Sequence, residues 1–195
     1  MARARRAQRE WVRLPVAERA RVLSRFHGVL FERRDAILDA IQNETGKTRK
    51  DAFGELLAVA ATASYYAVHG ERCSREEVRD GAVPLATGGR VQHPPLGVVG
   101  FITPWNYPFL LAIGDALPAL LAGNGVVIKP SEVTPLAAEL AVRLLGEAGL
   151  PADLAGLVHG PGSAVGPRSS PPWTPSPSPA APRRDGRSPR RRPSA

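Results

Sequence analysis

The chain has 195 residues, of which 43% are hydrophobic, enough for one ordinary globular domain. Its formal net charge of +8 is uneven, because residues 167–195 carry seven Arg and one Asp, a charge of +6, which leaves +2 for the rest and excludes a uniformly basic domain. A single cysteine excludes an internal disulfide framework, and the sequence contains neither a signal-peptide core nor a membrane-length apolar run, so a soluble cytoplasmic protein is expected.

The first part of the chain predicts a series of amphipathic helices. Pro15 suits a first helical residue, and apolar residues then recur at helical spacing up to Thr45-Gly46, which indicates a stop. A further helix is expected after the stop, and an arginine-rich solvated face is expected on an initial helix before Pro15. The residues concerned are Val22, Phe26, Val29, Leu30, Ile37, Leu38 and Ile41 before the stop, Phe53, Leu56, Leu57 and Ala60 after it, and Arg3, Arg5, Arg6 and Arg9 at the start.

Between residues 83 and 91 the sequence becomes strand-like around Gly88-Gly89. Two glycines between strand-like residues are typical of a two-residue hairpin turn. We therefore expect a β-hairpin with its turn at these two glycines.

The central stretch, residues 97–132, predicts a strand, a crossover helix and a second strand. An apolar run ends at Ile102, the turn TPWNYP follows, and one helix is expected over residues 109–121 before a second strand that ends in KPSE, residues 129–132. Two strands joined by such a crossover are parallel, and ligands bind beyond their carboxyl ends. Both turns therefore lie where chemistry is expected.

A glycine-closed amphipathic helix is expected next, over residues 136–149, and a third parallel strand over residues 156–159. The fold class is therefore α/β, with N-terminal helices next to part of a parallel, Rossmann-like sheet. Residues 1–166 are expected to form the ordered part of the chain.

The PWNYP turn followed by LLAGNGVVIKPSEVTP resembles the aldehyde dehydrogenase superfamily. The upstream segments LPVAERARVL and NETGK are most similar to its succinate-semialdehyde dehydrogenase branch. The resemblance covers residues 4–166, about the first third of such an enzyme. It implies an incomplete aldehyde-dehydrogenase-like fold, an aldehyde substrate for the complete enzyme, and a homo-oligomer whose interface the hairpin helps to build.

Asn106 matches the family's asparagine, whose side-chain amide donates to the oxyanion that forms on the aldehyde oxygen. An amide suits this role because it donates without a charge that would trap the product carboxylate. An asparagine between prolines also commonly caps a turn, and spacing alone would favour that interpretation. The neighbouring Trp105 and the KPSE segment favour the catalytic interpretation.

Lys129 and Glu132 match family residues that hydrogen-bond the hydroxyls of the cofactor's adenosine ribose. An anionic acceptor beside the 2′-hydroxyl favours NAD and repels the 2′-phosphate of NADP, whereas Lys129 and Ser131 could also serve a phosphate. The implied cofactor is therefore NAD or NADP. An ordinary charged turn at a strand end is the alternative.

Other residues match the lining of the family's cofactor cleft. Gly162 belongs to a glycine-rich segment, residues 160–166, that departs from the GxGxxG pattern, and a strand-to-helix turn is the alternative interpretation. Backbone and apolar contacts with the cofactor are implied for Ile102, Thr103, Pro104 and Trp105.

The family's chemistry also needs a thiolate nucleophile and a base that activates water. Cys73 lies in CSREE, unlike the family's nucleophile segment, so it is interpreted as incidental. The four histidines show no metal-ligand spacing, and no metal site is expected. The chain by itself is therefore expected to be inactive.

Residues 167–195 contain nine Pro, seven Arg and six Ser but no Leu, Ile, Val or Phe, which is typical of disorder. The abrupt loss of the family pattern suggests a frameshifted or truncated gene, which the other reading frames of the DNA would test. The alternative function is a non-enzymatic protein whose basic tail binds nucleic acid or another polyanion. Nucleic acid is not the expected partner, because aromatic residues do not interleave with these arginines.

Overall fold

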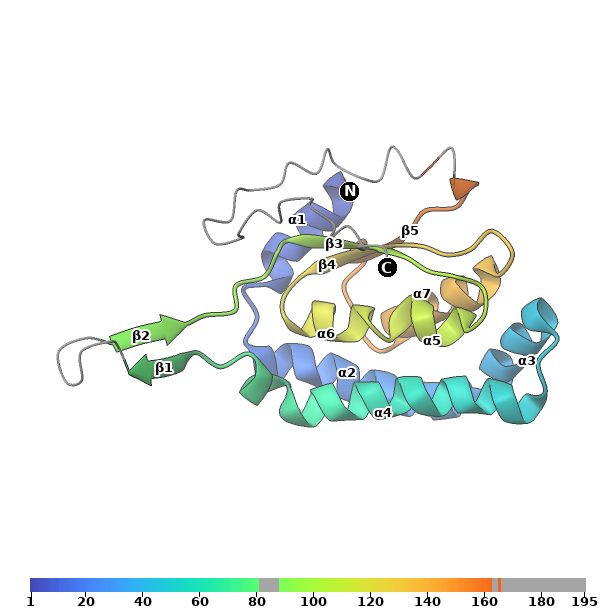
Figure 1. Cartoon of the computed structure of the whole chain (residues 1–195), viewed down its shortest axis with the longest axis horizontal. Helices are drawn as coiled ribbons and strands as arrows, with labels where there is room; N and C mark the ends of the chain where they lie inside the picture. The colour runs from blue at the N-terminus through green and yellow to red at the C-terminus, as the bar shows by residue number, and fades with distance from the viewer. Residues whose placement is uncertain (81–87, 163–164, 166–195) are drawn as a thin grey trace, which may run out of the picture.

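The computed structural model of the chain describes residues 1–80, 88–162 and 165, so the predicted disordered tail over 167–195 lies outside it. Figure 1 shows a small sheet, crossover helices on one face of it, and long helices packed beneath those. The described part has the α/β class that the sequence predicts, with a parallel sheet. None of its helices is long and apolar enough to cross a membrane.

The N-terminal part is helical throughout: α1 (Ala2–Trp11), α2 (Val16–Glu32), α3 (Arg34–Thr45) and α4 (Arg49–Cys73). The predicted stop at Gly46 is confirmed, because this residue closes α3 with a left-handed φ of 69° that favours glycine. The start of α2 is one residue later than predicted, since Pro15 is its N-cap.

Helices α2 and α4 lie side by side along the base of the molecule (Figure 1). Most of the predicted apolar stripe of α4 is confirmed, but Leu57 is 44% exposed. The buried stripe follows the spacing of Leu56, Ala60 and Ala63, which turns the neighbouring Leu57 away from the core. Fully buried residues on the two helices include Leu23, Phe26, Leu30, Leu56, Val59 and Ala63.

The sheet contains β3 (Val98–Ile102), β4 (Gly125–Lys129) and β5 (Ala155–Leu157), in that order and all parallel. Every residue of β4 is buried, as expected for a central strand that is covered on both faces. The third strand is shorter than predicted, because β5 ends at Leu157 and His159 lies beyond it. The parallel unit inferred from the sequence is thus confirmed.

The prediction of one crossover helix over residues 109–121 is wrong. The crossover consists of α5 (Pro108–Ile113) and α6 (Ala116–Leu121), separated at Gly114-Asp115. Pro118 explains the break, because a proline has no N–H to donate to the carbonyl four residues earlier, Gly114, and its ring clashes with that carbonyl. The helix α7 (Pro135–Glu147) then follows β4 and packs beside α5.

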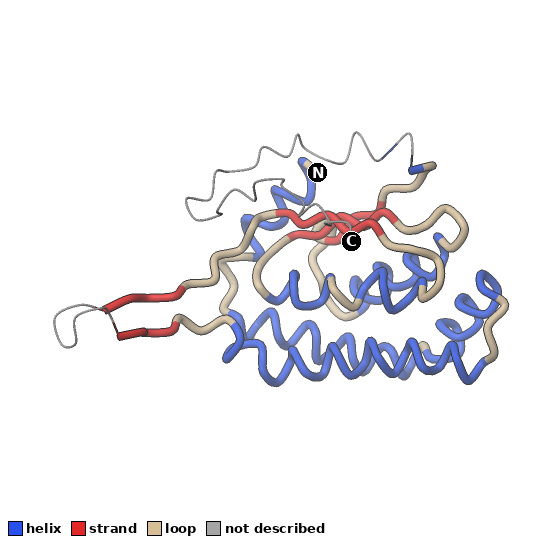
Figure 2. Tube along the Cα trace, in the orientation of Figure 1, coloured by secondary structure: helices blue, strands red, loops and turns tan. Residues whose placement is uncertain are grey.

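The predicted position of the hairpin turn is also wrong. Gly88 and Gly89 open β2 (Gly88–Val91), where they pair with Asp80 and Arg79 of the antiparallel strand β1 (Glu77–Asp80). The connection therefore falls within residues 81–87, outside the described residues. Figure 2 shows the two strands projecting from the body of the molecule.

Charged side chains from the N-terminal helices hold the C-terminal ends of the crossover helices. Arg19 is buried, and its Nε donates to the carbonyl of Leu121 at the end of α6, at 2.7 Å. Arg25 makes the same contact, also 2.7 Å, with the carbonyl of Ala148 just after α7. A cation at a helix C-terminus is stabilising because the unpaired carbonyls there carry partial negative charge. The helical layer is thereby fixed to the layer that covers the sheet.

Candidate active site

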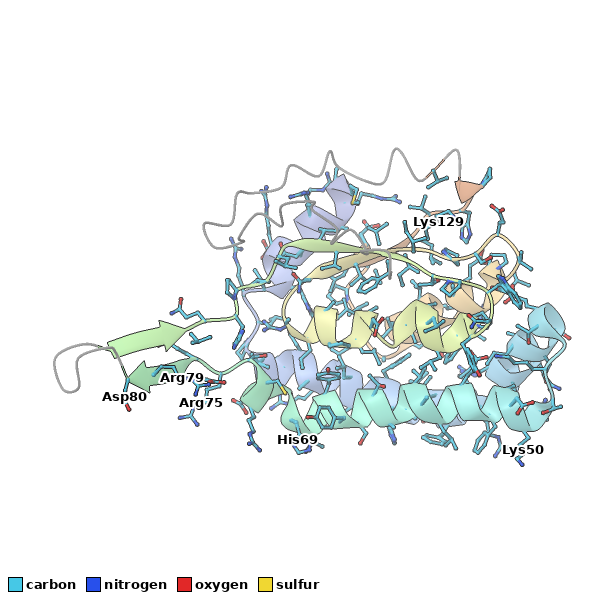
Figure 3. All side chains as sticks on the ribbon, in the orientation of Figure 1. Lys50, His69, Arg75, Arg79, Asp80 and Lys129 are labelled. Carbon is cyan, nitrogen blue, oxygen red and sulfur yellow. The ribbon has the colours of Figure 1, made fainter. Side chains whose placement is uncertain are left out.

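The two turns singled out from the sequence leave the sheet at the same edge. Ile102 is paired with Lys129 in the parallel ladder, and the N–H of Thr103 donates to the carbonyl of Lys129 at 3.0 Å. The TPWNYP and KPSE turns therefore begin beside one another. In Figure 3, Lys129 marks this edge, at the opposite end of the molecule from the hairpin residues Arg79 and Asp80.

Exposed apolar side chains gather at these turns. Ile102 is 69% exposed, Trp105 is 60% exposed and Tyr107 is 48% exposed. Val133, after the second turn, is 63% exposed. Pro104 and Asn106 are exposed too, while Thr103, whose N–H donates to the neighbouring strand, is buried. Apolar groups concentrated at one edge mark a surface that another group covers, such as a ligand or a further part of a protein.

Lys129 and Glu132 provide complementary hydrogen-bonding groups. The side chain of Lys129 is buried, and its ammonium donates to the carbonyl of Pro130 at 3.1 Å, with no ion-pair partner among the described residues. An ammonium has three donors, so donors remain for a ligand. Glu132 is exposed three residues later, and its carboxylate can only accept. The edge thus offers a hydrogen-bond donor from Lys129 and an acceptor from Glu132.

The Ser131 hydroxyl is engaged locally, since it accepts from the N–H of Val133 at 3.3 Å. Gly162 lies beyond β5 and is exposed, and no atom of the other described residues lies within 4 Å of the place where a Cβ would be. Its own position therefore has room for a side chain. Nothing in the described residues joins Gly162 to the two turns, so its proposed role at the cofactor stays a prediction.

The backbone of the first turn is held by a lysine that sequence reasoning missed. The Nζ of Lys47 donates to the backbone carbonyl of Asn106 and lies 3.8 Å from the centre of the Tyr107 ring. The side-chain amide of Asn106 itself makes no hydrogen bond within the described part of the chain. It is exposed, and so it is available to a ligand.

Glu55, which the sequence analysis also missed, connects this turn to the helical layer. Its carboxylate is almost fully buried: Oε1 accepts from Lys47 at 2.6 Å, and Oε2 accepts from the N–H groups of Phe109 and Leu110, each at 3.1 Å. The signal was present in the sequence, because Glu55 stands on the apolar face of α4, three residues after the buried Ala52. A charge on a buried face requires a partner.

A second carboxylate performs the same task at α7. The two oxygens of Glu44 accept from the N–H groups of Leu136 (2.5 Å) and Ala137 (2.9 Å) in the first turn of that helix. Thr134 is the N-cap residue, and a threonine there normally accepts from these N–H groups. Because Glu44 accepts from both N–H groups, the buried Thr134 hydroxyl is left without a hydrogen-bond partner among the described residues.

An open hollow of about 440 Å³ lies next to the first turn, lined in part by Lys47, Glu55, Tyr107 and Leu110. No group of three or more His, Cys, Asp or Glu side chains that could hold a metal ion occurs in the described residues. Cys73 is exposed at the end of α4. Its interpretation as an incidental residue stays a prediction.

Comparisons with known proteins show the family to which this fold and these turns belong. The sequence model of the "Aldehyde dehydrogenase family" matches residues 1–169. The chain is 47% identical over 165 residues to a Mycolicibacterium smegmatis protein named "Putative succinate-semialdehyde dehydrogenase", specified for NADP(+), covering 85% of this chain and 32% of the relative. It is 40% identical over 162 residues to the N-succinylglutamate 5-semialdehyde dehydrogenase of Escherichia coli O157:H7, covering 80% and 31%.

Solved structures show the same likeness. An NAD-dependent benzaldehyde dehydrogenase from Corynebacterium glutamicum superposes with a TM-score of 0.76 at 35% identity, over 84% of this chain and 36% of that one. An E. coli NADP-dependent enzyme gives 0.78 at 33% identity, over 85% and 34%. The chain thus spans about a third of the length of the curated relatives it matches.

Proposed function

Because the chain belongs to the aldehyde dehydrogenase family, we propose that it supplies the first part of an NAD(P)-dependent aldehyde dehydrogenase, with part of the cofactor site and the oxyanion asparagine. The observation that carries the proposal is the register of β3 and β4. It brings Thr103 against Lys129, so the turn with Asn106 and the turn with Glu132 start from adjacent strand ends. Such an edge is where open α/β sheets bind ligands.

Asn106 is proposed to donate its side-chain amide to the aldehyde oxygen as negative charge develops there. The exposed amide, which has no hydrogen-bond partner in the described residues, supports this role, because it need not break an internal bond before it acts. A neutral donor stabilises the oxyanion and still releases a carboxylate product.

Lys129 and Glu132 are proposed to bind the ribose hydroxyls of a nicotinamide dinucleotide, which supplies the hydride acceptor when it is bound. The spare donors of the buried Lys129 ammonium support this assignment. Relatives are named for both NADP(+) and NAD, so either cofactor is proposed, and the exposed carboxylate of Glu132 is free to turn away from a 2′-phosphate. Ile102, Pro104 and Trp105 are proposed to contact the cofactor as exposed groups around this edge.

A small aldehyde that also carries a carboxylate, such as succinate semialdehyde, is the proposed substrate. Support comes from the names of relatives, which specify succinate semialdehyde and N-succinylglutamate 5-semialdehyde. The projecting hairpin, whose strand residues are all exposed, is proposed to form part of an oligomer interface in the complete enzyme.

The test is to join residues 1–166 to the remaining two thirds of the M. smegmatis relative and follow reduced cofactor formation from succinate semialdehyde. The joined protein is expected to oxidise the aldehyde, and the 195-residue chain alone is expected not to, because it holds no counterpart of the family's nucleophile and base. Reduction of NAD or NADP by the chain alone would contradict the proposal. So would a Lys129→Ala joined protein with an unchanged KM for both cofactors.

A further inference from the structure

We propose that Lys47 and Glu55 are positioning residues that hold the Asn106 turn in its productive geometry. This inference rests on the proposed function, because it concerns how the oxyanion donor is placed. Neither side chain belongs to the two turns: Lys47 lies between α3 and α4, and Glu55 lies within α4. Both act on the turn from the helical layer.

The Asn106 turn is anchored at its start by the sheet. The N–H of Thr103 donates to the carbonyl of Lys129, at 3.0 Å. From Pro104 to Tyr107 the residues are exposed, and these residues provide no buried side chain to fix the backbone. The middle and the end of the turn must therefore be held by other groups.

Lys47 holds the middle of the turn. Its Nζ donates to the backbone carbonyl of Asn106 and also lies over the Tyr107 ring, 3.8 Å from the ring centre. A cation that contacts the carbonyl of one residue and the ring of the next restricts the peptide plane between them. Because the side chain of Asn106 extends from this same backbone, fixing that plane helps to fix the position from which the donor extends.

Glu55 holds the end of the turn and also orients Lys47. Its Oε2 accepts from Phe109 and Leu110 in the first turn of α5, which starts two residues after Asn106. Its Oε1 accepts from Lys47 at 2.6 Å, and the carboxylate is shielded from water. A charge-assisted hydrogen bond in such a place is stronger and better defined than one at the surface. The carboxylate therefore links the lysine to the helix start as one unit.

The chain offers two matched controls. Arg49, two residues after Lys47, makes exposed ion pairs with Asp35 and Asp39 and has no contact with the Asn106 turn in the described residues. Glu44 caps α7 rather than α5, so it holds the helix that follows the KPSE turn. Substituting Arg49 tests for general effects of a lost charge, and substituting Glu44 tests whether any lost helix cap gives the same result.

The first experiment measures hydrogen exchange in the 195-residue chain. Lys47→Met and Glu55→Gln are expected to speed amide exchange in the segment 104–111 about tenfold, with strand 125–129 unchanged, because a local opening leaves the sheet intact. Arg49→Met is expected to leave both segments unchanged, and Glu44→Gln to speed exchange around residues 135–138 instead. Equal exchange in 104–111 for all four variants and the unsubstituted chain would overturn the proposal.

The second experiment uses the joined enzyme described above and a double-mutant cycle. Lys47→Met is expected to lower kcat about tenfold and to leave the KM for the cofactor unchanged, with Lys47→Arg recovering most of the loss. In the Asn106→Ala background, Lys47→Met should cost nothing further, since no amide remains to be positioned. A residue with a merely structural role would lower the rate in both backgrounds, and that result would overturn the proposal.

The same cycle separates this inference from the proposed function. If Asn106→Ala leaves kcat unchanged, the oxyanion role fails and the positioning role fails with it. If Asn106→Ala lowers kcat but Lys47→Met and Glu55→Gln do not, the oxyanion role stands and only the positioning role is refuted.

Discussion

Replacing Asn106 by alanine in the joined enzyme should separate stability from catalysis. The side chain is exposed and its amide has no hydrogen-bond partner in the described part of the chain, so folding does not depend on it. A surface substitution of this kind changes the free energy of unfolding by about 0.5 kcal/mol or less. The backbone carbonyl that Lys47 holds is unaltered by the change, so the turn itself should survive.

The rate should respond very differently. Loss of one oxyanion donor costs on the order of 10² to 10³ in kcat, about 3 to 4 kcal/mol, because the donor acts only once charge has formed on the substrate oxygen. Asn106→Asp should be at least as harmful, since a carboxylate accepts where a donor is needed and repels the oxyanion. The assay is steady-state formation of reduced cofactor at saturating NAD or NADP, with thermal unfolding measured on the same preparations.

Glu132→Gln is the matched variant, because it also lies at the edge but acts on the ribose. It should raise the KM for NAD, while kcat at saturating cofactor stays near that of the unsubstituted enzyme. If the joined enzyme kept its full kcat after Asn106→Ala, Asn106 would be only a turn residue.

Three further outcomes are expected. Thr134→Val should stabilise the protein by about 1 kcal/mol in denaturant unfolding, because it removes a buried hydroxyl that has no partner in the described part of the chain and keeps the side-chain shape. Hydrogen bonds from Arg49 and Arg34 lower the pKa of Asp35. The stability that Asp35 contributes is therefore present above its ordinary pKa and is lost as the pH falls through the lowered pKa. Arg49→Gln should move the Asp35 pKa upward in an NMR titration. Any polyanion binding by the chain should weaken steeply with salt and vanish when residues 167–195 are deleted, whereas cofactor binding should be unaffected by the deletion.

The parallel unit could be predicted because its signals are local. The apolar run before Ile102, the buried strand before Lys129 and the helical stretch between them fit within one crossover, and a crossover of that length allows only parallel strands. The placement of the two turns at one edge follows from that topology. The stop at Gly46 was equally local, since a left-handed residue at a helix end favours glycine.

The errors have local causes as well. A pair of glycines suggests a turn, but Gly88 and Gly89 instead open a short, fully exposed strand, where they pair with β1 through their backbone. The apolar run of the crossover indicated one helix, but Pro118 within it favours a break, which the structure has between α5 and α6.

The residues that fix the Asn106 turn and the start of α7 could not be predicted from sequence motifs, because their hydrogen-bonding partners are remote in sequence. Glu55 meets Phe109 and Leu110 across more than fifty residues, and Glu44 meets Leu136 across more than ninety. The helical spacing of apolar residues places Glu55 on a buried face, but it does not identify the N–H groups that donate to its carboxylate. Only the packing of the helical layer against the crossover helices does so.

The signs of these long-range contacts follow one electrostatic rule. Carboxylates from the helical layer sit at the starts of crossover helices, as Glu55 and Glu44 do, and guanidinium groups sit at the ends, as Arg19 and Arg25 do. Each charge meets the partial charge of opposite sign that a helix presents there. Since the starts of α5 and α7 lie at the same edge as the two turns, the carboxylates act next to the proposed chemistry, while the arginines act at the far ends, where they stabilise the fold without reaching the site.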